Sequence, residues 1–389
     1  MPSLDSLIRD PYAALGVRKF INATCHWTRF GGTLIPDDVL DAMREAARSH
    51  IDMTELQKAA GRVIAQYTHA EDGYIVSGCA AAMLVATAAI LTGKDPARMM
   101  QLPETAGLKN MCVAKRFERR KTPDGREYAH YGYAHAVKTA GVKFVEIGDG
   151  ETVTRDEFEK TLSPQVALVY WVGYAPPGDL PAGEMIKIAH EHGVKVLIDA
   201  SNSLPPRENL HRFIDLGADV VCYSGGKGLQ GPQGSGIIAS TREIIESVAM
   251  QAAPTQGIGR VGKVSKEEII GLIAALTLWA ERDDEERMSE HHRKARLLAD
   301  SVRDIRNAQV SVVFPDHNQR PYPTVHVKAQ PASGMNAKAV LDALHAGDPA
   351  IAGMGHSDPA VVRLDVRLCE DSEIKAVGKR LHEIFSAKR

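Results

Sequence analysis

Lys227 is the first residue whose surroundings suggest chemistry, because it lies in the glycine-rich stretch YSGGKGLQGPQGSG at residues 223–236. The preceding run, ADVVCY, predicts a buried strand. A lysine at such a strand end can hold a phosphate electrostatically. It can also act as a nucleophile beside a flat cofactor that occupies the room left by the glycines. A turn lysine can equally be a solvated charge and nothing more.

The surroundings of Lys227 depart from those of a P-loop. That motif requires a glycine, four residues, Gly-Lys, and then Ser or Thr to hold magnesium. Here Cys222 stands near the position of the first glycine, and Gly228 replaces the hydroxyl residue. The sequence therefore argues against a nucleotide-phosphate loop.

Asp199 supplies the partner that covalent chemistry at Lys227 would need. It ends a predicted strand in VLIDAS, 28 residues before the lysine. Pyridoxal 5'-phosphate (PLP) bound to a lysine is paired with an acidic residue at its ring nitrogen, which makes the ring an electron sink. A strand-end aspartate is also often a helix cap, so this clue depends on others.

The segment VSGCAAAM (76–83) predicts a strand, a tight turn and a helix. The first amides of that helix, from Gly78 to Ala81, are placed to hold a phosphate, with help from the Ser77 hydroxyl. Ser224 is a further candidate for the same phosphate. Each feature alone also fits an ordinary helix start or turn. Their order along one sheet, together with the lysine and the aspartate, predicts a PLP site.

Composition excludes several classes of protein. With 389 residues, 44% of them hydrophobic, the chain is long enough for one large domain and a smaller one. A formal net charge of −2 does not indicate an electrostatic nucleic-acid binder. The five cysteines form no CxxC pair, which argues against a structural zinc site and a disulfide framework. The start has no apolar signal-peptide core, and the longest apolar run, 166–175, is about half of a membrane span. We expect a cytoplasmic protein.

The middle of the chain alternates apolar strands with helical patterns, which predicts an α/β fold with a mostly parallel sheet covered on both faces. Ligands in such sheets bind at the carboxyl ends of the strands, where the lysine and the aspartate are expected. The predicted strands are 73–76, 111–114, 143–147, 166–172, 194–199, 218–224 and 236–240, and the predicted helices are 79–93, 183–193 and 206–217.

The pattern changes after about residue 263. A charged, helical stretch predicts one long connecting helix, followed by strands at 310–314, 324–328 and 361–368 and helices near 336–346 and 371–387. We expect residues 55–262 to form a large PLP-binding domain. Residues 1–54 and 263–389 should form a smaller α+β domain, against which a helix at 37–49 packs.

Three stretches carry a resemblance to a known family: INATCHWTRFGGTLIPDDVLDAM, IDASNSLPPRENLHRFIDLGADVVCYSGGKGLQGPQGSG and GIGRVGKVSKEEIIGLIAAL. They resemble the selenocysteine synthase-like family of fold-type I, aspartate aminotransferase-like PLP enzymes. Within it, the chain is most similar to the shorter D-glucosaminate-6-phosphate ammonia-lyase type. The likeness covers most of the chain, and the SGGKGLQGPQ block is its most specific part.

The resemblance implies roles for named residues of the cofactor site. Lys227 would form the Schiff base with PLP, and Asp199 would hold the ring nitrogen. The remaining cofactor-binding residues would be Ser77, Gly78, Cys79, Ser201, Ser224 and Arg260, the last near the active site of a neighbouring subunit.

Substrate residues are expected on a loop that borders the substrate in this family and on a later strand. His26 is a candidate acid or base, given the ordinary pKa of histidine. Thr28 and Arg29 lie on the same loop, and Arg367 could bind a substrate carboxylate. An exposed strand face explains Arg367 equally well.

Two departures limit what the resemblance implies. Selenocysteine synthases are longer and use an added domain and a basic surface to bind transfer RNA, whereas this chain is slightly acidic. Ser201 and Asn202 stand where relatives usually carry smaller residues. The substrate preference therefore stays open.

The function expected is α,β-elimination of ammonia from a β-hydroxy amino acid or amino sugar acid, giving a 2-keto acid. An amino-acid racemase, epimerase or aldolase is the alternative within PLP chemistry. A non-catalytic PLP-binding or RNA-associated protein is the alternative from another class. A shared active site implies a homodimer or a higher homo-oligomer.

Overall fold

The computed structural model describes residues 2–174, 176–316 and 319–386. The chain divides into two compact units. The larger unit is Ile35–Arg282, and the smaller unit combines Met1–Leu34 with Asp283–Arg389.

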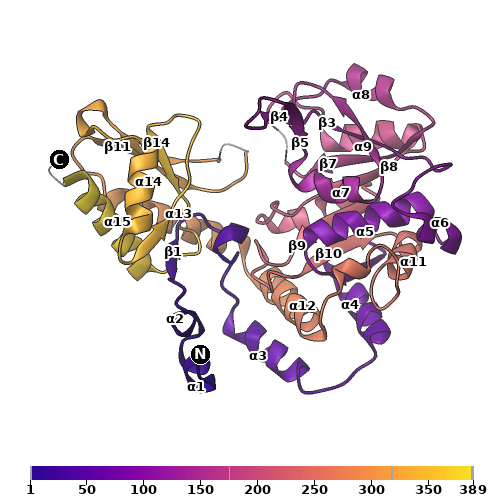
Figure 1. Cartoon of the computed structure of the whole chain (residues 1–389), viewed down its shortest axis with the longest axis horizontal. Coiled ribbons are helices and arrows are strands. Elements are labelled where there is room, and N and C mark those ends of the chain that lie inside the picture. The colour runs from indigo at the N-terminus through magenta and orange to yellow at the C-terminus, as the bar shows by residue number, and fades with distance from the viewer. Residues whose placement is uncertain (1, 175, 317–318, 387–389) are drawn as a thin grey trace. The chain divides into compact units, whose positions relative to one another are not determined.

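The larger unit is built on a seven-stranded sheet with the strand order β2-β10-β9-β8-β7-β3-β6 (Figure 1). β10 is antiparallel to both of its neighbours, and the other pairs are parallel, so the predicted mostly parallel sheet is confirmed. The strands are β2 (Asp72–Val76), β3 (Met111–Lys115), β6 (Lys143–Ile147), β7 (Val166–Val172), β8 (Lys195–Asp199), β9 (Val220–Ser224) and β10 (Gly236–Ser240).

Helices cover both faces of this sheet, because almost every strand residue is apolar and buried. One face packs against α4 (Met53–Thr68), α8 (Arg155–Thr161), α9 (Ala182–Glu191) and α12 (Lys266–Glu281). The other packs against α5 (Cys79–Thr92), α7 (His135–Thr139) and α11 (Arg242–Gln251). Alternation along each strand decides which face a side chain joins. Leu197 and Asp199 of β8 therefore share the face of α5.

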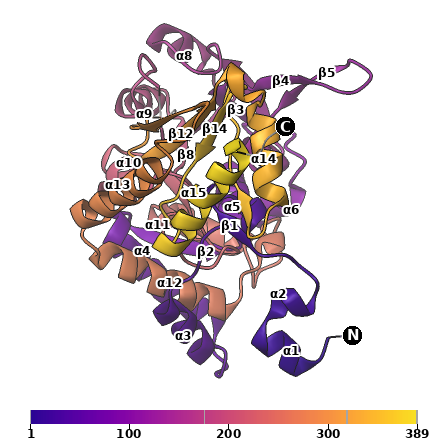
Figure 2. The same cartoon turned by 90° about the vertical axis from the view of Figure 1, so that its left-hand side faces the viewer.

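Shorter elements complete the larger unit. A hairpin of β4 (Glu118–Lys121) and β5 (Glu127–His130) extends from the sheet (Figure 2). The remaining elements are α3 (Asp37–Ala46), α6 (Pro96–Gln101), η2 (Gly132–Ala134), η3 (Arg207–Leu210), α10 (Arg212–Asp215) and η4 (Arg260–Gly262).

The smaller unit has its own apolar core beneath an antiparallel sheet of order β11-β12-β14. Its strands are β11 (Ala308–Val313), β12 (Thr324–Ala329) and β14 (Val361–Leu364), with β1 (Phe20–Asn22) paired to β13 (Ala350–Ala352). Its helices are α1 (Leu4–Arg9), α2 (Pro11–Ala14), η1 (Thr28–Phe30), α13 (Asp284–Ser301), η5 (Pro331–Ser333), α14 (Ala337–Ala346) and α15 (Asp371–Ser386).

The observed boundaries differ from the expected ones at 54 and 262. α3 packs on α12, where the Lys266 Nζ donates to the carbonyl oxygen of Ala46 at 2.8 Å. The helix therefore packs on the segment that follows residue 262, as expected, but both belong to the larger unit. The expected long connecting helix is two helices, α12 and α13, because Arg282 is extended and the Asp283 side chain caps α13.

Two expected elements are shorter than predicted. The helix expected at 206–217 consists of η3 and α10, and the strand expected at 361–368 ends at Leu364. Among the residues described, no helix combines the length and apolar character that crossing a bilayer requires.

Candidate active site

Asp199 and Lys227 lie at the carboxyl ends of neighbouring parallel strands. Asp199 is the last residue of β8, and Lys227 lies on the turn that follows β9. The two strands pair in parallel, with Asp199 beside Cys222. Both groups therefore lie where ligands bind in sheets of this kind.

The Asp199 carboxylate is 5% exposed and is surrounded by neutral donors. The backbone N–H of Ser201 donates to its Oδ1 at 3.0 Å, and the Tyr170 hydroxyl donates to its Oδ2 at 3.2 Å. The Cys79 thiol lies 3.9 Å from Oδ1. Burial, and then the nearby Asp199 charge, raise the pKa of Tyr170 and of Cys79 well above their ordinary values, so both stay protonated.

Lys227 is half-buried, and Ser201 connects it to the same carboxylate. Its Nζ donates to the Ser201 hydroxyl at 3.2 Å and lies 5.3 Å from the centre of the Tyr133 ring. Ser201 thus contacts both predicted groups, through its backbone N–H and its side chain. The structure brings Lys227, Asp199 and Ser201 together.

The turn before α5 is the place where the sequence predicts an anion site. Gly78 is the N-cap residue with a φ of 89°, a conformation that suits glycine, and no side chain caps the helix. The first amides of α5 are therefore not satisfied by a cap and point to where a phosphate would bind. The backbone N–H of Ser77 donates to the carbonyl oxygen of Gly262 at 3.0 Å, which fixes the turn.

β10 brings Ser224 to the same edge of the sheet. Gly236 pairs with Ser224 on one side and with Val76 on the other. A Cβ at Gly236 would lie 2.6 Å from the backbone nitrogen of Cys79, so glycine is required for this close approach. Ser224 and the start of α5 consequently lie on either side of β10.

Arg260 begins η4, and its side chain is exposed. Within this chain, η4 lies beside Ser77 through Gly262. The segment is therefore near the anion site of its own chain. The contribution of Arg260 to a neighbouring subunit stays a prediction.

These residues fit PLP by the chemistry of their groups. They comprise a lysine amine, a buried carboxylate and uncapped helix amides, all beyond the carboxyl ends of the strands. Asp199 and α5 share one face of the sheet. This set matches the carbonyl, the ring nitrogen and the phosphate of that cofactor.

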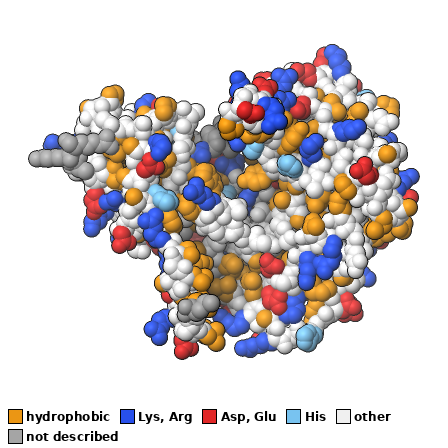
Figure 3. All heavy atoms as spheres, in the orientation of Figure 1, with side chains coloured by type: hydrophobic (Ala, Val, Ile, Leu, Met, Phe, Trp, Pro, Cys, Tyr) orange, Lys and Arg blue, Asp and Glu red, His pale blue; other side chains and the backbone are white. Residues whose placement is uncertain are grey.

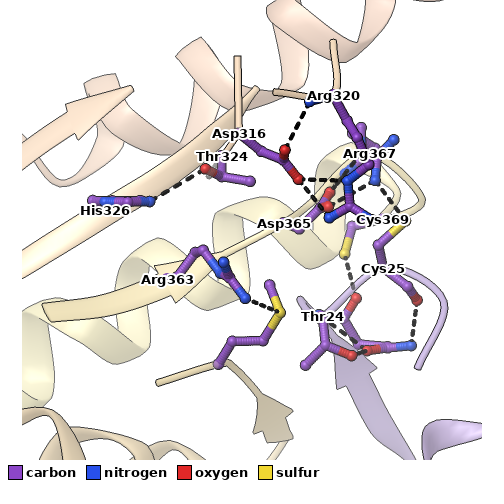
Figure 4. Close-up of polar contacts among 12 residues, drawn as sticks. Thr24, Cys25, Asp316, Arg320, Thr324, His326, Arg363, Asp365, Arg367 and Cys369 are labelled. Atoms are coloured by element: carbon purple, nitrogen blue, oxygen red, sulfur yellow. Dashed lines mark hydrogen bonds and ion pairs between the residues drawn. The ribbon is translucent and has the colours of Figure 1, made fainter. Parts of the chain in front are cut away.

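The predicted substrate residues lie in the smaller unit, where Arg367 is 6% exposed and paired with Asp365 (Figure 4). Its Nε donates to Oδ1 at 2.9 Å and a terminal nitrogen donates to Oδ2 at 2.8 Å. The guanidinium also lies 3.7 Å from the centre of the Tyr322 ring. The expectation of an exposed strand face is therefore wrong for Arg367.

Charges in this cluster stabilise one another. Burial opposes ionisation of Asp365, but the Arg367 charge and its hydrogen bonds, with a smaller contribution from His26, lower the pKa of this carboxyl. Burial likewise acts against the Arg367 charge, and the Asp365 carboxylate outweighs it and raises the arginine pKa. His26 is half-buried, whereas Thr28 and Arg29 lie exposed on η1.

Sequence reasoning missed Tyr170 and Tyr133. Tyr170 lies inside the apolar run VALVYWV, where its period-two position beside Leu168 placed it on the face of Leu197 and Asp199. This alternation is the sequence signal that identifies Tyr170 as a neighbour of Asp199. Nothing in the sequence around Tyr133 links η2 to Lys227. The turn glycine Gly228 has a packing role, because a Cβ there would lie 2.6 Å from the Leu204 carbonyl oxygen.

Comparison with known proteins agrees with this geometry. The model of the aminotransferase class-V family matches residues 132–369. A 5'-C-glycyluridine monooxygenase-decarboxylase from a Streptomyces species is 30% identical over 346 residues, which cover 87% of this chain and 83% of that protein. The D-glucosaminate-6-phosphate ammonia lyase of Salmonella typhimurium is 27% identical over 386 residues, 96% of this chain and 97% of that protein.

Comparison with solved structures shows the same similarity. A solved structure of D-glucosaminate-6-phosphate ammonia-lyase superposes with a TM-score of 0.80 and 26% identity, covering 97% of this chain and 98% of that chain. The L-seryl-tRNA(Sec) selenium transferase of Rhizobium meliloti is 28% identical over 268 residues, but these span 52% of that protein. The expected resemblance to selenocysteine synthases and to the ammonia-lyase type is confirmed.

Proposed function

This chain belongs to the aminotransferase class-V family and uses PLP, and we propose that it is an ammonia-lyase. Its substrate is a β-hydroxy amino acid or amino sugar acid, from which it removes ammonia to give a 2-keto acid. The observation that carries this proposal is the near full-length similarity, in sequence and in structure, to D-glucosaminate-6-phosphate ammonia-lyase.

The larger unit holds the cofactor in this proposal. Lys227 would bond to its carbonyl carbon, and Asp199 would keep a proton on its ring nitrogen. The first amides of α5, with the hydroxyls of Ser77 and Ser224, hold its phosphate. When bound, PLP supplies an electron sink for the pair of electrons left at the α-carbon of the substrate.

The protein's own groups then move the protons. Once the substrate amine has replaced the lysine on the cofactor, the freed Lys227 Nζ would remove the α-proton of the substrate, with the Ser201 hydroxyl holding the lysine amine in place. His26 is our candidate for the acid that assists departure of the β-hydroxyl, and Thr28 and Arg29 are candidates to bind the substrate. Arg367 stays a weaker candidate for the substrate carboxylate, because Asp365 already occupies its paired nitrogens.

The partners follow from this reaction. The substrate is a small molecule, and the exposed Arg260 beside Ser77 suits a homo-oligomer in which subunits share active sites. The visible face of the larger unit carries basic and acidic side chains interspersed (Figure 3). That pattern favours a small substrate over RNA. The cytoplasmic location stays a prediction from the sequence.

A panel of substrates tests the reaction class. D- and L-β-hydroxy amino acids and sugar amino acids, with and without phosphate, would be incubated with the enzyme. Elimination predicts ammonia and a 2-keto acid in equal amounts from at least one of them. Deuterium incorporation at the α-carbon without ammonia would indicate racemisation instead. Glycine with an aldehyde would indicate aldol cleavage.

A second candidate function rests on the Streptomyces relative, whose name describes a monooxygenase-decarboxylase. Oxidative decarboxylation at an α-carbon would consume oxygen and release carbon dioxide. The same panel, run with and without oxygen, distinguishes the two. Oxygen-dependent release of carbon dioxide would favour this second function, whereas ammonia release in the absence of oxygen favours the lyase.

A further inference from the structure

His69, His211 and Asp215 form a cluster that the proposed reaction does not use. One nitrogen from each histidine and one carboxylate oxygen all lie within 4.8 Å of one another. His69 ends α4, whereas His211 and Asp215 bracket α10, so two segments far apart in the sequence meet here. The cluster belongs entirely to the larger unit.

The geometry directs both imidazoles to one carboxylate. Nδ1 of His69 lies 2.8 Å from Oδ1 of Asp215, and Nδ1 of His211 lies 2.6 Å from Oδ2. The two rings stack with centres 4.2 Å apart and an angle of 23° between their planes. The two Nδ1 atoms therefore face the same carboxylate from adjacent, nearly parallel rings.

The charges of the cluster suit a divalent cation. Partial burial opposes ionisation of Asp215, but hydrogen bonds from His211 and then His69 lower its pKa, so this carboxyl is ionised at neutral pH. A neutral imidazole and a carboxylate are ligands for zinc and related transition metals. The three side chains are between 33% and 54% exposed, which leaves the metal access and room for water ligands.

The cluster lies where two connections enter the large sheet, so a bound metal would join them. α4 leads into β2, and α10 leads into β9, both at their amino ends. Asp199 and Lys227 lie beyond the carboxyl ends. A metal here would tie together two connections that enter the sheet at the edge opposite to the active site.

We propose that His69, His211 and Asp215 form a binding site for a divalent transition-metal ion, of which Zn²⁺ is the test case. The ion clamps the end of α4 to α10 and stabilises the larger unit without taking part in catalysis. Metal binding requires each Nδ1 atom to carry no hydrogen, which then either moves to Nε2 of the same ring or is released, and water completes the coordination.

Calorimetric titration of ZnCl₂ into the full-length, PLP-loaded chain, without an affinity tag and after chelator dialysis, tests this site. We expect one Zn²⁺ per chain at this cluster and a rise in the unfolding temperature on binding. His69→Gln and His211→Gln should each lose that binding event and the thermal shift, with turnover unchanged. His190→Gln is the matched control, because His190 faces a single carboxylate, Asp219, at 2.9 Å in the same unit.

The possible results of this titration either support the metal site or overturn it. Loss of the binding event in both cluster variants, with retention in His190→Gln, supports the site. Absence of binding to the wild-type chain, or retention of the event in either cluster variant, overturns it. Because the cluster lies away from Lys227, the lyase proposal stands or fails independently of this result.

Discussion

The candidate active site of the larger unit and the Asp365–Arg367 pair of the smaller unit treat buried charge in opposite ways. In the larger unit, Asp199 is held by neutral donors, and Lys227 donates to a serine hydroxyl. In the smaller unit, Asp365 and Arg367 are nearly inaccessible and neutralise each other through two hydrogen bonds. The first arrangement leaves a carboxylate and an amine for a ligand to use, whereas the second satisfies its charges internally.

This difference separates a site prepared for chemistry from a site that organises the fold. A buried charge without a counter-charge is costly, so a protein retains it where a ligand will pair with it. A buried pair that is complete needs no ligand. We therefore assign the cofactor to the first region and a mainly structural role to the Asp365–Arg367 pair.

The largest expected effect comes from breaking the complete pair. Asp365→Ala leaves the Arg367 charge buried without its carboxylate, so we expect the free energy of unfolding to fall by about 3–5 kcal/mol. Asp371→Ala is the control, because Asp371 pairs with Arg293 where both side chains are more than two-fifths exposed, and it should lower the free energy of unfolding far less. Urea denaturation measures both. Equal losses would mean that the burial of the Asp365–Arg367 pair does not increase its contribution to stability.

The pH dependence of that loss sharpens the test. The pKa of Asp365 is lowered in the folded chain, so its stabilising contribution is present above the ordinary aspartate pKa of about 3.9. It is lost as pH falls through the lowered folded value. The difference in stability between wild type and Asp365→Ala should thus stay constant from neutral pH down to about pH 5 and shrink only below about pH 4.

The next effect concerns the region prepared for a ligand. Asp199→Asn keeps the shape of the side chain and removes the charge that holds a proton on the ring nitrogen. We expect turnover to fall by about 100-fold or more, while the phosphate contacts keep the cofactor bound. Turnover and cofactor content would be measured together, with the exposed Asp342→Asn as a control. Unchanged turnover would mean that another group faces the ring.

The smallest effect comes from a donor to that carboxylate. Tyr170→Phe removes the hydroxyl that donates to Asp199, so we expect turnover to fall by about tenfold, which corresponds to the lower end of the roughly 1.5–3 kcal/mol of a hydrogen bond to a charged group. Tyr223→Phe is matched, because its equally buried hydroxyl donates to the neutral Leu210 carbonyl at 2.8 Å. An equal fall in the Tyr223 variant would show that Tyr170 acts only through packing.

The sequence predicted the strands of the large sheet more completely than the contacts of the candidate site residues. All seven strands of the large sheet follow from apolar runs bounded by turn residues, because both of its faces are buried. Lys227 and Asp199 could be chosen because parallel strands place their carboxyl ends at one edge. The pairing of Arg367 with Asp365 could not be predicted from the sequence, because alternation along a strand predicts the face of a side chain and not the partner that it contacts.

The helical period of the sequence also did not predict the break between α12 and α13. Charged residues continue through Arg282 and Asp283, and their helical period is uninterrupted. The break depends on the Asp283 side chain accepting from the backbone of Glu286, a cap that competes with continued helix. Local capping decided the boundary between the units.

The central claim is that Lys227 bonds to the cofactor, and peptide mapping after reduction tests it most directly. Borohydride treatment of the PLP-loaded chain converts a lysine–cofactor double bond into a stable bond, which mass spectrometry locates. The account predicts that the modification lies on the peptide containing Lys227 and is absent from Lys227→Ala. Modification of Lys263 or another lysine in the wild-type chain, with Lys227 unmodified, would contradict the account.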